Sequence, residues 1–132
     1  MWLPITSLYA ALGILVYLAL AAHVSRVRRE EQVGLGTGGN ERLTRAVRAH
    51  GNTAEYLPLA LIGLALLEIQ EMGGHWLHLA GGAIIVGRFL HAWGLSRSTG
   101  VSTGRFVGTL LTWLALVGMA GLLLWRALSG VI

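Results

Sequence analysis

Two long stretches of the chain contain neither an acidic residue nor an arginine, and they restrict the fold to one that crosses a membrane. The first runs from Leu3 to Val24 and the second from Phe106 to Trp125. A helix needs about 20 apolar residues to cross roughly 30 Å of hydrocarbon, and each stretch is long enough. Only 12% of the 132 residues are charged, whereas a soluble domain has about a quarter. The sequence therefore predicts an integral membrane protein.

Two further apolar stretches are too short to cross a membrane unless their polar flanks belong to the same helices. Tyr56–Leu67 becomes long enough if its helix begins near Leu43, and Met72–Gly87 if its helix continues through Arg88 and His91. We therefore expect a single domain, residues 1–132, with helices at about 3–25, 42–70, 74–96 and 104–128. Two of these helices are purely apolar, and two carry ionisable groups at membrane depth.

Arginine supplies all ten basic residues, and most of them lie in or near two of the three predicted loops. The loops after the first and third helices hold Arg26, Arg28, Arg29, Arg42, Arg97 and Arg105. The turn after the second helix holds two glutamates and no arginine. Because positively charged loops stay in the cytoplasm, we expect both termini outside. The same rule explains the net charge of +4 without a nucleic-acid partner.

A stripe of polar side chains runs along the predicted second helix. Arg48, Asn52 and Glu55 lie at i, i+4 and i+7 on one helix face, and Arg88 and His91 lie at i and i+3 on the third helix. An ionised group at the centre of a lone helix costs about 2.5–3.5 kcal/mol, so these groups must face protein, water or a ligand. One interpretation is packing, with Glu55 paired to Arg88. The excess of arginine favours the other, a cytoplasm-facing pocket for a carboxylate.

Several kinds of chemistry are excluded by the sequence. There is no cysteine, hence no disulfide, thiolate metal site or cysteine nucleophile. No pattern typical of a serine or metal hydrolase or a nucleotide-binding loop is present. His75 and His78 lack a third metal ligand beyond Glu71, so we interpret them, with Trp76, as part of an interfacial belt and expect no metal. Small residues at Gly104, Gly108, Thr112, Ala83 and Gly87 indicate close helix packing.

The stretch RAVRAHGNTAEYLP, Arg45–Pro58, resembles the signature of the MAPEG family, the membrane-associated proteins of eicosanoid and glutathione metabolism. That signature is loosely R-A-H-x-N-x-x-E-x-x-P, and its fixed positions match Arg48, Ala49, His50, Asn52, Glu55 and Pro58. The family's third-helix pattern, G-R-x-x-H, recurs as GRFLH at Gly87–His91. Arg26 and Arg105 match arginines after the first helix and near the start of the fourth. The resemblance covers essentially the whole chain.

This resemblance implies an all-α, four-helix membrane bundle that assembles as a homotrimer, with glutathione between subunits near the cytoplasmic face. The residues that it assigns to glutathione binding are Arg26, Arg48, Asn52, Glu55, Arg88 and His91. It assigns activation of the thiol to Arg105, since a nearby guanidinium lowers the pKa of a thiol and raises its thiolate fraction. Because the preceding loop has one extra residue, Arg97 is the alternative for this role.

Two positions depart from the family's pattern. Gly51 stands where eicosanoid-making members have an arginine, and Leu95 stands where a tyrosine is expected. The compact form and the exclusive use of arginine indicate a bacterial member, in an inner membrane. We therefore expect a glutathione transferase that acts on hydrophobic electrophiles, with glutathione-dependent peroxidase activity as an addition. The alternatives are a non-enzymatic membrane subunit that uses its polar stripe for packing or lipid headgroups, and a transporter, which the small size disfavours.

Overall fold

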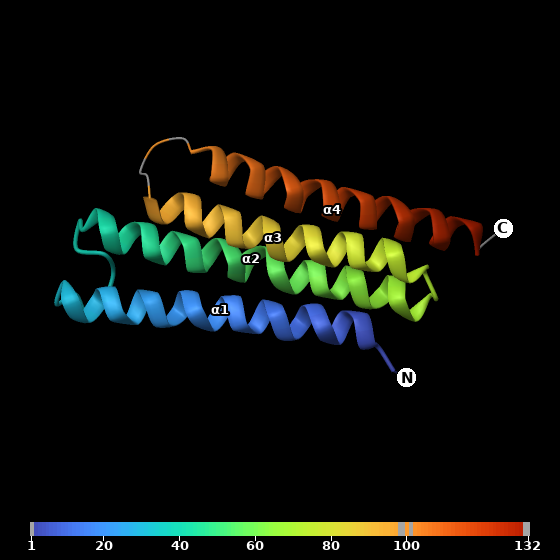
Figure 1. Cartoon of the computed structure of the whole chain (residues 1–132), viewed down its shortest axis with the longest axis horizontal. Coiled ribbons are helices and arrows are strands. Elements are labelled where there is room, and N and C mark those ends of the chain that lie inside the picture. Colours follow the sequence, from blue (N-terminus) through green and yellow to red (C-terminus); the bar gives the residue numbers. More distant parts are fainter. Residues whose placement is uncertain (1, 98–99, 101, 131–132) are drawn as a thin grey trace.

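The chain folds into four antiparallel helices (Figure 1). The computed structural model describes residues 2–97, 100 and 102–130. The helices are α1 (Pro4–Glu30), α2 (Glu41–Ile69), α3 (Gly74–Arg97) and α4 (Thr103–Ser129). Each is long and apolar enough to cross a membrane. The predicted all-α, four-helix membrane fold is thus confirmed.

The helix ends differ from the expected ones mainly in α1, which continues to Glu30 instead of ending near residue 25. Its last turns contain Arg28 and Arg29, which are good helix formers and lie favourably near the negative end of the helix dipole. Asn40 caps α2, because its side chain accepts the Leu43 N–H at 2.9 Å. The same helix runs on without interruption to Ile69.

The helices pack as a flattened bundle with α2 and α3 at its centre. Both central helices contact each other and both outer helices, whereas α1 and α4 share no contact in the described part of the chain. As a result, 44% of the most apolar 18-residue stretch of α3 is buried inside the bundle, against 6% of the corresponding stretch of α1. The termini lie at one end of the bundle together with the α2–α3 turn, and the other two loops lie at the opposite end (Figure 1).

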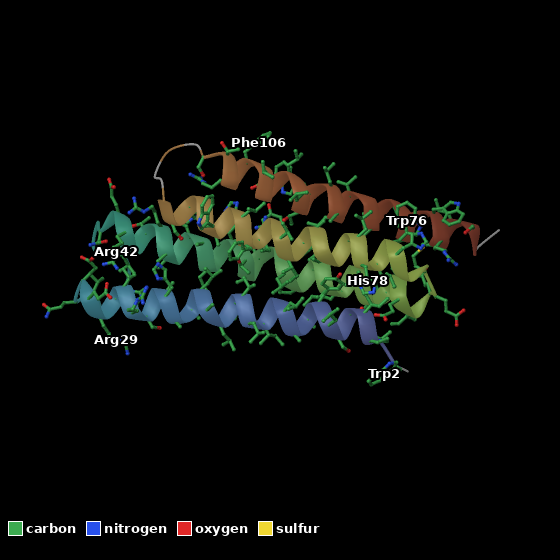
Figure 2. All side chains as sticks on the ribbon, viewed as in Figure 1. Trp2, Arg29, Arg42, Trp76, His78 and Phe106 are labelled. Atoms are coloured by element: carbon green, nitrogen blue, oxygen red, sulfur yellow. The ribbon has the colours of Figure 1, made fainter. Side chains whose placement is uncertain are left out.

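The two ends of the bundle carry different kinds of side chain, aromatic at one end and basic at the other (Figure 2). Trp2 and Trp76 lie at the end with the termini, and Arg29 and Arg42 lie at the opposite end (Figure 2). Both tryptophans are more than half exposed, at 84% and 51%. Exposed tryptophans suit the membrane–water boundary, and arginines suit the side that stays in the cytoplasm.

The main apolar core fills the half of the bundle nearer the termini. Its buried members are Leu57, Ala60, Leu64, Leu67, Leu77, Ile84 and Met119. In the other half, α3 and α4 approach through glycine. A Cβ atom added at Gly87 would lie 2.6 Å from Thr112 Oγ1 and 2.8 Å from the carbonyl oxygen of Gly108. The ridge of small residues therefore brings the two backbones together, as expected.

The start of α1 is held by hydrogen bonds to the two central helices. The Glu68 carboxylate accepts hydrogen bonds from the backbone N–H groups of Ile5, at 2.9 Å, and Thr6, at 2.7 Å. The Tyr9 hydroxyl donates to the carbonyl oxygen of His78 at 3.0 Å. A carboxylate at a helix N-terminus satisfies free N–H groups and interacts favourably with the helix dipole. Glu68 thus replaces a local cap for α1.

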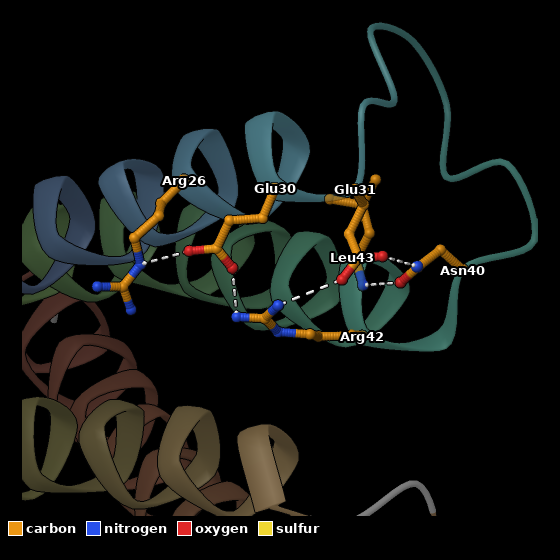
Figure 3. A network of polar contacts seen from close by, with 6 residues as sticks. All are labelled: Arg26, Glu30, Glu31, Asn40, Arg42 and Leu43. Atoms are coloured by element: carbon orange, nitrogen blue, oxygen red, sulfur yellow. Dashed lines mark hydrogen bonds and ion pairs between the residues drawn. The ribbon is translucent and has the colours of Figure 1, made fainter.

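The end of α1 is joined to the start of α2 by an exposed network of charges (Figure 3). Arg42 contacts the carboxylates of Glu30, at 2.6 Å, and Glu31, at 3.2 Å. Asn40 Nδ2 donates to Glu31 at 2.7 Å. Arg26 lies 3.8 Å from Glu30, one turn away on the same helix. Two of the arginines at this end are therefore already neutralised by glutamates.

Candidate functional site

The buried side chain of Arg88 on α3 contacts both α2 and α4. Arg88, only 1% exposed, donates through Nε and Nη2 to Thr112 Oγ1, at 3.0 and 2.8 Å. Nη2 also reaches the Gly108 carbonyl oxygen at 3.3 Å, and Nη1 donates to Asn52 Oδ1. The guanidinium carbon lies 4.8 Å from the centre of the Tyr56 ring. We call these contacts the Arg88 brace; they link α2, α3 and α4.

The positive charge of the brace is not balanced by a carboxylate within the described residues. Glu55 is exposed, and it makes no ion pair or hydrogen bond in that part of the chain. The interpretation that Glu55 pairs with Arg88 is therefore wrong for a single chain. Asn52, three residues earlier on α2, faces Arg88 instead, so the partners of the cation are neutral oxygens.

A basic cleft of about 260 Å³ lies at the loop end of the bundle, between α2, α3 and α4. Its lining residues are Glu41, Thr44, Arg45, Arg48, Leu95 and Arg105, and we call it the arginine cleft. Arg45 and Arg48 make no hydrogen bond or ion pair within the described residues, and Arg105 donates to the Gly100 carbonyl oxygen at 2.8 Å. Three guanidinium groups and one carboxylate line this cleft, and the excess of positive charge favours a bound anion.

A second cleft, of about 430 Å³, adjoins the first and is mostly apolar. We call it the aromatic cleft, and it is lined by His91, Ser102, Arg105, Phe106, Thr109, Leu110 and Trp113. His91 is almost fully buried, with Nδ1 3.0 Å from Thr109 Oγ1. Phe106 and Trp113 are more than half exposed, and Phe106 projects from the start of α4 (Figure 2). Arg105 lines both clefts, at the boundary between basic and apolar surface.

A larger cleft lies elsewhere and offers no comparable chemistry. It measures about 590 Å³, lies between α3 and α4 toward the termini, and is lined by apolar side chains and glycine. Because it contains no titratable group, we do not regard it as the reactive site.

The residues expected in the site fall into separate groups. The brace contains Asn52 and Arg88, the arginine cleft contains Arg48 and Arg105, and the aromatic cleft contains His91. Arg26 and Glu55 line neither cleft: Arg26 lies near Glu30, and Glu55 is exposed without a hydrogen bond or ion pair in the described part of the chain. The side chain of Arg97, the alternative to Arg105, lies outside the described residues.

Two contributors were not expected in the site. Thr112 appeared only as a small packing residue, and Tyr56 was not singled out, yet Thr112 accepts two hydrogen bonds from Arg88. The Tyr56 hydroxyl accepts a hydrogen bond from Trp113 Nε1 at 3.1 Å. The available signal for Thr112 was a hydroxyl in the middle of an otherwise apolar helix, because such a group needs a partner inside the membrane.

Comparison with known proteins covers nearly the whole chain. The model of the MAPEG family matches residues 6–125. The protein named inner membrane protein YecN, in two strains of Escherichia coli, is 31% identical over 121 residues, which is 92% of this chain and 91% of the relative. The family match extends from the first turn of α1 to near the end of α4, and it includes the brace and both clefts.

Proposed function

The chain belongs to the MAPEG family, and we propose that it is a membrane glutathione transferase that joins the glutathione thiol to hydrophobic electrophiles. The position of Arg105, which lines both clefts, carries this proposal. On one side, free guanidinium groups suit the carboxylates of a peptide. On the other, aromatic side chains suit an apolar partner that arrives from the lipid.

The chemistry requires a thiolate at the boundary between the clefts. The thiol loses its proton to water, and the Arg105 guanidinium stabilises the remaining negative charge. The thiolate then forms a carbon–sulfur bond with the electrophile, whose leaving group or double bond takes up the displaced electron pair. With a lipid hydroperoxide instead, two glutathione molecules would be oxidised to their disulfide while the hydroperoxide is reduced to an alcohol and water.

We further propose that the protein works as a homotrimer in a bacterial inner membrane. Glu55 supports the assembly: its carboxylate is exposed at membrane depth, and an uncovered charge there is costly. A neighbouring copy would cover it. Native mass spectrometry in mild detergent should show three copies, and a stable monomer would contradict both the trimer and a shared site. The proposed location rests on the Escherichia coli relative, which is named an inner membrane protein.

The activity is tested by measuring glutathione binding and conjugation on the purified full chain. Calorimetry should detect glutathione binding, and a generic aromatic electrophile should be conjugated in its presence. Arg105→Ala should spare binding but lower turnover, on the order of a hundredfold, because a charge that stabilises the reacting group is lost. Arg126→Ala, on the same helix but at the opposite end, is the matched control and should leave the rate unchanged.

A non-enzymatic membrane subunit is the second candidate, and the Arg88 brace favours it. The brace uses part of the polar stripe for contacts within the chain, as a packing device would. In that case glutathione should neither bind in calorimetry nor raise the melting temperature of the protein.

A further inference from the structure

The Arg88 brace fixes which side of the Asn52 amide faces inward. Arginine carries only donors, so the atom of Asn52 that meets Nη1 has to be the carbonyl oxygen Oδ1. The amide nitrogen Nδ2 therefore lies on the other side of the amide, and it donates to no group in the described part of the chain. Asn52 itself is only partly buried. It consequently has two N–H groups available to a bound molecule.

The N–H groups of Arg88, in contrast, are not available to a bound molecule. Its side chain is 1% exposed, whereas that of Asn52 is partly exposed. Its Nε, Nη1 and Nη2 groups all donate to protein oxygens. Thr112 is held in turn, because its hydroxyl donates to the Gly108 carbonyl at 2.9 Å. Contacts with Thr112 and Gly108 on α4 thus hold the guanidinium in place. The guanidinium can in turn fix the orientation of the Asn52 side chain on α2.

We propose that Arg88 is a positioning residue that acts on the bound molecule only through Asn52, which it orients as a double donor for a carbonyl or carboxylate oxygen. This inference rests on the proposed function, in which that oxygen belongs to the peptide frame of glutathione. It also sets a specificity: an amino group cannot replace the oxygen at Asn52, because donors would then face donors. The amino group of glutathione must bind elsewhere.

Asn52→Asp tests the donor role of the amide. The carboxylate keeps an oxygen for Arg88 and adds an ion pair, so the protein should be at least as stable to heat as the wild type. It replaces the N–H groups with a second oxygen, so affinity for glutathione should fall roughly tenfold. Unchanged affinity in this variant would overturn the donor assignment.

A double-mutant cycle tests whether Arg88 acts only through Asn52. Arg88→Lys keeps the charge but loses the forked geometry, and it should weaken glutathione binding several-fold with kcat at saturating glutathione unchanged. In an Asn52→Ala background the same substitution should change affinity by less than about twofold. An equal loss in both backgrounds would mean that Arg88 contacts glutathione itself, and would overturn the inference.

A ligand-free measurement separates this inference from the proposed function. If the wild type does not bind glutathione, the proposed function fails, and the brace is then tested by NMR on the free protein. The Arg88 Nε–H signal should exchange slowly with solvent deuterium in the wild type and rapidly in Thr112→Val, which removes its acceptor. Rapid exchange in the wild type would show that Thr112 does not hold Arg88 and would overturn its role in positioning Asn52, whatever glutathione does.

Discussion

Replacing Gly108 by alanine should separate α3 from α4. A Cβ atom at this position would lie 2.5 Å from the backbone nitrogen of His91 and 2.9 Å from its Cβ atom. These atoms belong to the body of a helix and cannot swing aside as the end of a long side chain would. The two helices must therefore move apart, which also lengthens the hydrogen bonds from Arg88 to Gly108 and Thr112.

The expected loss of stability follows from these contacts. Forcing a methyl group into a packed interface costs about 1–3 kcal/mol, and a weakened buried hydrogen bond costs about 1 kcal/mol more. Alanine offsets roughly 0.5–1 kcal/mol, because it favours the helix over glycine. Gly108→Ala should therefore lower the free energy of unfolding by about 1–3.5 kcal/mol.

Gly118→Ala is the matched control, since it lies on the same helix and a Cβ atom there meets nothing within 4 Å. It should be neutral or stabilise by up to about 1 kcal/mol. Both variants can be unfolded in mixed micelles with increasing dodecyl sulfate, with loss of helix followed by circular dichroism. If the two unfold at the same detergent composition, the close approach of α3 and α4 does not limit stability and the reasoning is refuted.

Three other outcomes are expected. Glu68→Gln should destabilise the protein by about 0.5–1 kcal/mol in the same assay, because a charge at the start of α1 is lost, whereas the exposed Glu71→Gln should not. Arg42→Ala should leave stability close to that of the wild type, since its ion pairs are exposed to solvent; a large loss would show that the loop network holds α1. Reporter fusions at the C-terminus should read outside, and a cytoplasmic signal would contradict the orientation.

The four helices could be predicted because hydrocarbon thickness sets a minimum length for each apolar stretch. That constraint ends at the membrane surface, which explains the error at α1: beyond residue 25 the backbone follows helix propensity and local charge, and these carry it to Glu30. Arg26 shows the same limit, since its contact is with a glutamate one turn away. Sequence spacing does not distinguish such a local pair from a ligand contact.

The partner of Arg88 could not be predicted from spacing alone. Asn52 and Glu55 lie close together on one face of α2, and the rotation of α3 against α2 decides which of them meets the guanidinium. That rotation depends on the glycine contact between α3 and α4, because Thr112 and Gly108 hold the arginine from the other side. The sequence therefore places Asn52, Glu55 and Arg88 among the polar groups of the two helices but does not show which of them pair.

The acceptors of Arg88 enter the membrane at different times during synthesis. When α3 is inserted, Asn52 on α2 is already there, but Thr112 and Gly108 on α4 have not yet entered the membrane. Until they arrive, the guanidinium has one hydrogen-bond partner, Asn52, in a hydrocarbon environment where an unpaired charge is costly. The first three helices therefore form an incomplete intermediate, and arrival of the last helix is the step that commits α3 to its place in the bilayer.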